Sequence, residues 1–123
     1  MIFVFGSNLA GRHGLGAAKH AKLHEGAAYG VGEGRSGNSY ALPTKDEGIK
    51  TRSLADIEIS IAKFIAYAED SPEEVFKVTP IGCGLAGYKQ SQIRALFLRY
   101  YIPENVVFSK EWFQPYKEVK VFK

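Results

Sequence analysis

The chain has 123 residues, 46% hydrophobic and 24% charged, with a formal net charge of +3 and a single cysteine. This composition is typical of a soluble globular protein, and the length allows one core, so we expect a single domain over residues 1–123. No apolar run approaches the roughly 20 residues of a membrane-spanning helix. The chain opens on a strand pattern rather than a signal peptide, and we predict a cytoplasmic protein without a membrane partner.

Strand-like and helix-like segments alternate along the chain. Ser53, followed three residues later by Asp56, predicts a helix N-terminus, and apolar residues at helical spacing follow it. Five glycines between residues 26 and 37 predict a loop. The alternation favours an α/β fold with a mostly parallel sheet covered on both faces. The expected elements are strands over 2–5, 39–43, 75–81, 105–108 and 118–122, and helices over 17–25, 53–71 and 90–100.

Two glycine loops each follow a predicted strand and precede a predicted helix. The first covers residues 6–16, and the second, Gly82–Gly87, has three glycines in six residues. Glycines leave the backbone N–H groups accessible, so such loops can hold a phosphate or carboxylate. The alternative is a tight turn that needs a positive φ. The first loop matches neither a Walker A motif nor a dinucleotide fingerprint. Together the two loops predict one site for an extended, phosphate-bearing small molecule.

Three side chains near these loops are candidates for chemistry, each with a plainer alternative. Asn8 can hydrogen-bond a ribose hydroxyl or simply close a turn. Lys45 follows a predicted strand; a lysine there can pair with phosphate or, when unprotonated, attack an aldehyde or anomeric carbon, but most loop lysines are only solvated. Cys83 has no visible activating base, so we interpret it as a packed residue. His20 and His24 lack further ligands at zinc spacing, and we predict no metal and no cofactor.

Three segments together resemble the macrodomain family of ADP-ribose binders. They are the first loop with its Gly6-Ser-Asn8 start, Leu42–Lys45, and Thr79–Gly87. Within that family they are similar to the branch of the terminal ADP-ribose glycohydrolase and the DNA ADP-ribose antitoxin DarG. A closer likeness is to short macrodomain-like proteins of bacteria and their phages. The resemblance runs from about Ile2 to Phe108 and implies a three-layer α/β/α fold with a mixed, mostly parallel sheet, shortened at the N-terminus.

The resemblance also implies a role for each matching residue. Lys45 is the implied catalytic lysine, which attacks C1″ of the ring-opened ribose or stabilises its developing charge. Asn8 contacts the distal ribose, and the second loop wraps the diphosphate. The implied partner is ADP-ribose or an ADP-ribosylated substrate, including ADP-ribosylated DNA. The implied ligand-binding residues are Ser7, Asn8, Gly11, Gly14, Leu15, Gly16, Gly82, Cys83, Gly84, Leu85, Ala86, Gly87 and Tyr88.

Two departures from the family pattern keep alternatives open. Ala86 stands where the terminal glycohydrolase has an acid–base aspartate, whereas the DarG type has glycine there. The aspartate that reads adenine in the usual macrodomain has no counterpart, and Phe3, Tyr88, Trp112 and Phe113 are candidates to stack on a base instead. The first hypothesis is hydrolysis of an ADP-ribosyl linkage. The second is a non-catalytic binder of ADP-ribose or a related nucleotide, and the third a nucleic-acid-binding module.

Overall fold

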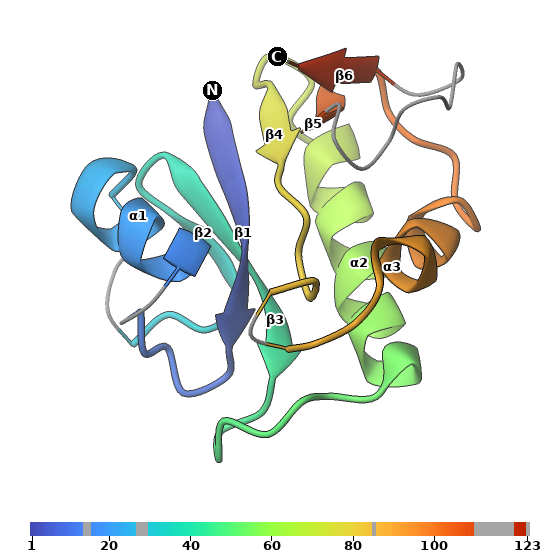
Figure 1. Cartoon of the computed structure of the whole chain (residues 1–123). Helices are drawn as coiled ribbons and strands as arrows, with labels where there is room; N and C mark the ends of the chain where they lie inside the picture. The colour runs from blue at the N-terminus through green and yellow to red at the C-terminus, as the bar shows by residue number, and fades with distance from the viewer. Residues whose placement is uncertain (14–15, 27–29, 85, 110–119, 123) are drawn as a thin grey trace.

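The computed structural model describes residues 1–13, 16–26, 30–84, 86–109 and 120–122 (Figure 1). In this part of the chain six strands form one sheet and three helices pack on it. The elements in chain order are β1 (Ile2–Asn8), α1 (Gly16–His24), β2 (Gly34–Ser36), β3 (Ser39–Lys45), α2 (Leu54–Glu69), β4 (Phe76–Val78), α3 (Gln90–Phe97), β5 (Val106–Ser109) and β6 (Lys120–Phe122).

The sheet has the order β2-β3-β1-β4-β5-β6 and is parallel except for β2, which runs antiparallel to β3. β1 lies between β3 and β4, but the two neighbours accompany it for different lengths. β4 pairs with β1 only as far as Val4, whereas β3 pairs with it as far as Asn8. The last residues of β1 are therefore flanked on one side by β3 and on the other by the loop that follows β4.

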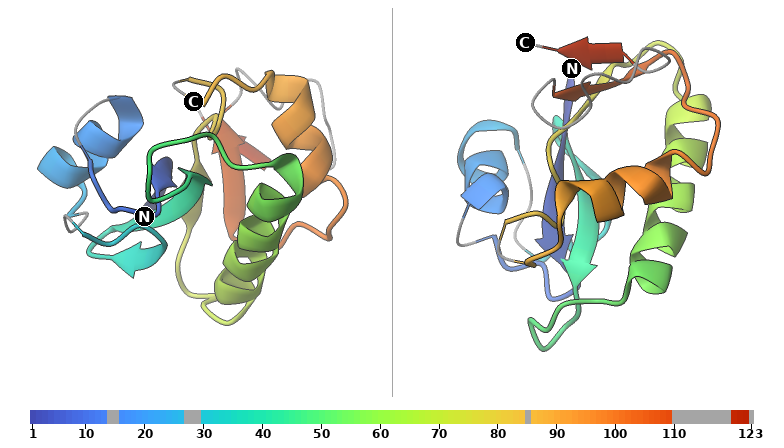
Figure 2. Two further views of the ribbon diagram at one scale, coloured as in Figure 1. Left: turned by 90° about the horizontal axis from the view of Figure 1, so that it is seen from below. Right: turned by 45° about the vertical axis from the view of Figure 1, so that its right-hand side comes forward.

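The helices cover both faces of the sheet, which confirms the predicted three-layer α/β/α fold (Figures 1 and 2). Consecutive residues of β1 point to opposite faces, as the pleat of a strand requires. Val4 belongs to the large core beneath α2 and α3, and Phe5 to a small core beneath α1. The small core contains two alanines of α1, Ala18 and Ala21, so α1 packs close to the strands.

The helix that carries most of the large core begins where the sequence predicts. Ser53 is the N-cap of α2, and its hydroxyl accepts a hydrogen bond from the Asp56 amide at 3.1 Å. The buried face of α2 consists of Ile57, Ser60, Ile61, Phe64, Ile65 and Ala68. Of the helices that the structure describes, none is both long and apolar enough to cross a membrane.

Some element boundaries differ from the prediction for identifiable reasons. β2 was expected to be part of a loop, but its three residues pair with β3, from Gly34 opposite Ala41 to Ser36 opposite Ser39. β3 continues through Pro43 to Lys45 because β2 begins only at Gly34, opposite Ala41, so on that side Pro43 has no ladder partner that needs an N–H. β4 and α3 are shorter than expected. The last strand was predicted over 118–122, and its described part is β6.

The Phe64 ring is the centre of the large core, which gives a stability prediction. It is fully buried and packs edge-on against Tyr40 and Phe76, at centroid distances of 5.1 and 5.6 Å. Phe64→Ala should lower the free energy of unfolding by about 3–5 kcal/mol. On the same helix Ile59 is 56% exposed, and Ile59→Ala should change it by less than about 0.5 kcal/mol. Urea denaturation measures both, and equal losses would contradict this description of the core.

Candidate functional site

The carboxyl ends of β1 and β3 lie together at one end of the sheet, and the loop that follows β4 lies beside the last residues of β1 (Figure 2, left). There Asn8, the last residue of β1, lies opposite Lys45, the last residue of β3, after a break in register at Ser7. The Leu9 amide donates to the Lys45 carbonyl at 2.9 Å, which closes the pair. Two candidate residues that lie far apart in the sequence are therefore neighbours, as expected for the ends of adjacent parallel strands.

The Asn8 side chain closes the loop that follows β1. Its amide nitrogen donates to the Arg12 carbonyl at 2.8 Å, and its oxygen accepts from the Arg12 amide at 2.9 Å. This is the turn-closing role that the sequence left as an alternative to ribose binding. An asparagine side chain has two N–H donors and two acceptor lone pairs, so each end keeps one position for a ligand. The geometry is compatible with both roles at once.

The other candidates of the first loop have structural roles where they are described. Ser7 is buried, and its hydroxyl donates to the Gly32 carbonyl. Gly11 has a φ of 71°, and a Cβ there would lie 2.3 Å from the backbone of Gly30. Gly16 is the first residue of α1. Two further predicted ligand residues, Gly14 and Leu15, lie outside the described residues.

The 79–88 loop folds on itself and on the end of β1. The Thr79 hydroxyl donates to the Val4 carbonyl at 2.8 Å. Within the loop the Tyr88 amide donates to the Gly82 carbonyl at 2.9 Å, and the Gly87 amide to the Gly84 carbonyl at 3.0 Å. The loop therefore has hydrogen bonds of its own that close it on itself.

Three backbone N–H groups of the 79–88 loop are not used in this way. Within the described part of the chain, the amides of Gly82, Gly84 and Ala86 donate to no protein acceptor. An ideal Cβ on Gly84 would meet no atom within 4 Å, so this side of the loop is open. Backbone N–H groups of a glycine-rich loop that have no protein acceptor can donate to an anion. Leu85, another predicted ligand residue, lies outside the described residues.

Cys83 lies in this loop as a thiol. Burial raises its pKa, an effect that the nearby Arg94 opposes, and Sγ lies 3.3 Å from the Ile81 carbonyl. A raised pKa disfavours the thiolate that a nucleophile needs. The loop also contains no aspartate or glutamate between residues 79 and 88. Its chemistry toward a ligand is therefore that of backbone N–H groups.

Lys45 begins a tight turn over residues 45–52. Lys45 pairs with Thr51 in an isolated antiparallel bridge, and Asp46 Oδ1 accepts from the amides of Gly48 and Lys50, both at 2.9 Å. The Lys45 side chain is half-buried, and among the described residues its amine makes no hydrogen bond or ion pair. The turn thus fixes the lysine backbone while its amine stays available.

Two hydrogen bonds join the 45–52 turn to the 79–88 loop. The Thr51 hydroxyl donates to the Ala86 carbonyl at 3.1 Å, and the Tyr88 hydroxyl donates to the Arg52 carbonyl. Sequence reasoning named Tyr88 as a ligand residue but missed Thr51. No local signal marks Thr51, because its partner lies 35 residues away.

Of the candidates for base stacking, Phe3 packs on His20 of α1, with 5.0 Å between the ring centroids. Trp112 and Phe113 lie outside the described residues.

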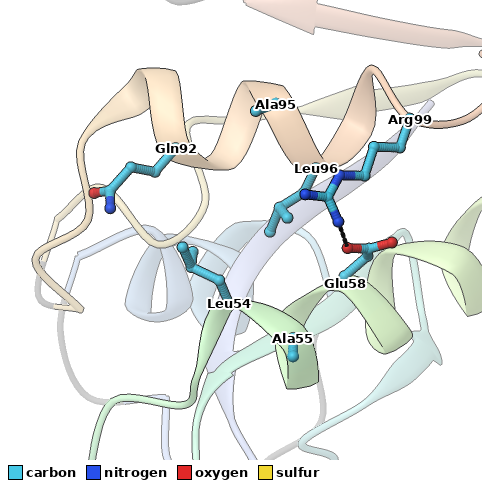
Figure 3. Close-up of a pocket in the computed structure, with 7 residues that line it drawn as sticks. All are labelled: Leu54, Ala55, Glu58, Gln92, Ala95, Leu96 and Arg99. Carbon is cyan, nitrogen blue, oxygen red and sulfur yellow. Dashed lines mark hydrogen bonds and ion pairs between the residues drawn. The ribbon is translucent and has the colours of Figure 1, made fainter.

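A groove of about 360 Å³ runs between α2 and α3 (Figure 3). Arg99 and Glu58 form an ion pair across it, and none of the predicted site residues lines it. It is therefore separate from the loops that follow β1, β3 and β4. Among the described residues no group of three or more histidine, cysteine, aspartate or glutamate side chains is placed to hold a metal ion.

Comparison with known proteins places the fold. No family model matches the sequence, and no curated protein matches it. The macrodomain of Mycobacterium tuberculosis DarG superposes with a TM-score of 0.62 at 18% identity, over 98% of this chain and 85% of that one. Thermosipho africanus DarTG, solved in complex with ADP-ribose, gives 0.61 at 18% identity, over 90% of this chain and 39% of that one. The chain has the macrodomain fold, and the likeness to DarG is confirmed at the level of the fold.

Ile49 has an unusual backbone conformation, which gives a second stability prediction. It is the one non-glycine residue in the described part of the chain with a positive φ, 63°, and it is 37% exposed. A left-handed conformation costs a β-branched residue more than it costs glycine, so Ile49→Gly should raise the free energy of unfolding by about 0.5–1 kcal/mol. Val75 is equally exposed, at 37%, with an ordinary φ. Val75→Gly should lower stability in the same denaturation experiment, and a loss in both variants would argue against strain at Ile49.

Proposed function

We propose that this protein binds ADP-ribose, with the diphosphate against the 79–88 loop and the distal ribose beside Asn8 and Lys45. The observation that carries the proposal is the pair of free amides on the accessible residues Gly84 and Ala86, in a loop that contacts β1 at Gly6 and bonds to the turn after β3. A diphosphate has several oxygens that accept hydrogen bonds from such amides. The presence of ADP-ribose in the DarTG structure supports this choice of ligand.

The arrangement of the loops suits an extended ligand better than a single phosphate. The free amides belong to the loop after β4, whereas Asn8 and Lys45 are at the ends of β1 and β3. In open α/β sheets, ligands bind across the carboxyl ends of neighbouring strands. One part of the ligand therefore contacts backbone N–H groups, and the next part contacts an amide side chain and an amine.

Gly84 offers a clean test of the diphosphate placement. Its Cβ position is open and its φ is not left-handed, so Gly84→Val should fold normally. The valine side chain would stand between the amides and the ligand. Since a hydrogen bond to a charged group contributes about 1.5–3 kcal/mol, affinity for ADP-ribose should fall about tenfold or more. Calorimetry measures the affinity and a thermal melt checks the fold.

Gly84→Ala is the matched control for this prediction. A methyl group excludes less of the ligand than an isopropyl group, so its affinity should fall between those of the wild-type protein and Gly84→Val. A folded Gly84→Val variant that binds ADP-ribose as tightly as the wild-type protein would refute the placement of the diphosphate.

We further propose that the protein hydrolyses an ADP-ribosyl linkage through Lys45. In a linkage through nitrogen, opening of the ribose ring gives a C1″–nitrogen double bond. The unprotonated Lys45 amine adds at C1″, and the C1″–acceptor bond breaks as the acceptor takes a proton. Water then adds to the lysine imine, the C1″–Nζ bond breaks, and ADP-ribose leaves as the aldehyde, which closes again. The net reaction consumes one water. The absence of protein partners on the Lys45 amine among the described residues supports this role.

Substitutions of Lys45 separate hydrolysis from binding. Lys45→Ala should reduce release of ADP-ribose from modified DNA and protein about a thousandfold or more, while the affinity for ADP-ribose falls less. Lys45→Arg should be equally inactive, because a guanidinium stays protonated and cannot attack C1″. Lys50→Ala removes a positive charge from the same turn and should keep the wild-type rate. Borohydride should trap the imine on the wild-type protein, and a Lys45→Ala variant that cleaves normally would refute the mechanism.

The alternative is a non-catalytic binder of ADP-ribose or a related nucleotide, and one observation favours it. Ala86 occupies the position of the acid–base aspartate in the terminal glycohydrolase type, and the 79–88 loop supplies no carboxyl group in its place. A wild-type protein that binds ADP-ribose but releases none from ADP-ribosylated DNA or protein would establish this alternative.

A further inference from the structure

We infer that Thr51 is a positioning residue, which sets Lys45 relative to the 79–88 loop through its hydrogen bond to the Ala86 carbonyl. The inference rests on the proposed hydrolysis and adds to it a residue that contacts neither the sugar nor the diphosphate in the proposed arrangement. Thr51 has two connections at once. Its backbone bridges to Lys45, and its side chain reaches Ala86 at 3.1 Å.

Through these two connections Thr51 links the 79–88 loop to Lys45. Ala86 has one of the free amides of the loop, and its carbonyl accepts the Thr51 hydroxyl. A hydrogen bond on the carbonyl limits rotation of the Ala86–Gly87 peptide. The backbone of Thr51, in turn, is bridged to Lys45 at the end of β3. The attacking amine is therefore set relative to the 79–88 loop, whose own hydrogen bonds hold its amides.

The rest of the 45–52 turn explains why Thr51 is the residue that matters. The Arg52 guanidinium donates to the Pro43 carbonyl at 2.8 Å and to the Ser60 hydroxyl at 2.9 Å, which fixes the base of the turn on β3 and α2. The Tyr88 hydroxyl bonds to the Arg52 carbonyl at this same base. Thr51, by contrast, is the bridge partner of Lys45, and its side chain bonds to Ala86 of the 79–88 loop.

Removal of this hydroxyl should change the rate rather than the affinity. Addition of the amine to C1″ needs the amine within a narrow range of distance and angle, and small misplacements reduce rates strongly. Binding of ADP-ribose depends on the amides of the 79–88 loop, which stay in place through the bonds of the loop itself. A substitution at Thr51 should therefore lower kcat and leave the dissociation constant nearly unchanged.

The experiment compares Thr51→Val with Thr51→Ser and Ser39→Ala. Valine keeps the branched shape without the donor, serine keeps the donor, and Ser39 provides a matched hydroxyl-to-carbonyl bond at the other end of β3, to Ser36 at 2.7 Å. We measure kcat and KM for release of ADP-ribose, the dissociation constant of ADP-ribose, and amide hydrogen exchange of residues 46–50 in the free proteins.

For Thr51→Val we expect kcat to fall about tenfold, a dissociation constant within about threefold of wild type, and faster exchange at the Asp46 and Lys50 amides. Thr51→Ser should restore kcat, and Ser39→Ala should keep it. Unchanged exchange and kcat in Thr51→Val would overturn the inference, as would a parallel loss of kcat and affinity. A wild-type protein that neither binds ADP-ribose nor releases it from a substrate would refute the proposed function itself. An active wild-type protein with an equally active Thr51→Val variant would refute only the role of Thr51.

Discussion

The close approach of the 79–88 loop to the exposed flank of β1 is the constraint on which the site depends. β4 leaves β1 at Val4, and the loop fills the space beside the remaining residues of β1. Even a methyl group on Gly6 would lie 3.4 Å from the Gly82 nitrogen and 3.6 Å from the Ile81 Cα. Gly82 itself has a φ of 73°, and its Cβ would press on Ile93 at 3.2 Å. The backbone that follows β4 thus lies in contact with β1 at Gly6, and at Gly82 it takes a left-handed conformation that favours glycine.

The contact between the 79–88 loop and β1 determines which polar groups at this end of the sheet are left without a protein partner. Most polar side chains at this end of the sheet bond to backbone and so build the loops: Ser7 to Gly32, Asn8 to Arg12, Asp46 to Gly48 and Lys50, Thr51 to Ala86 and Tyr88 to Arg52. What stays available is mainly backbone N–H and the Lys45 amine. Such groups recognise oxyanions and developing charge through their positions rather than through a selective side-chain pattern. The site is thus suited to the diphosphate and ribose of a nucleotide, and recognition of its base must come from other contacts.

The sequence predicted the layers, the helix faces and the two glycine loops, because each of these depends on local spacing. The Ser53 cap and the buried face of α2 agree with the structure for that reason. It did not predict β2, whose pairing depends on β3 rather than on its own glycine-rich residues. The closeness of Asn8 and Lys45 follows from parallel strand order, which alternating elements indicate. The Thr51–Ala86 bond could not be predicted because its two residues are distant in sequence, and the left-handed Ile49 could not because a β-branched residue rarely adopts this conformation.

A lysine mechanism at this site is limited by the small number of groups that can donate or accept a proton. A lysine nucleophile must lose its proton before attack, and the departing acceptor atom must gain one or leave as a stable anion. The 79–88 loop has no carboxyl group, Asp46 uses Oδ1 for two amides of its own turn, and the Tyr88 hydroxyl donates to Arg52. Among the described residues, water and the second carboxylate oxygen of Asp46, next to Lys45 in the chain, are then the remaining carriers of protons. Under the lysine mechanism the chain should therefore favour acceptors that depart with little protonation over strongly basic amines or alkoxides. The same scarcity of acid–base groups would leave binding of ADP-ribose intact, which is why rate and affinity must be measured separately.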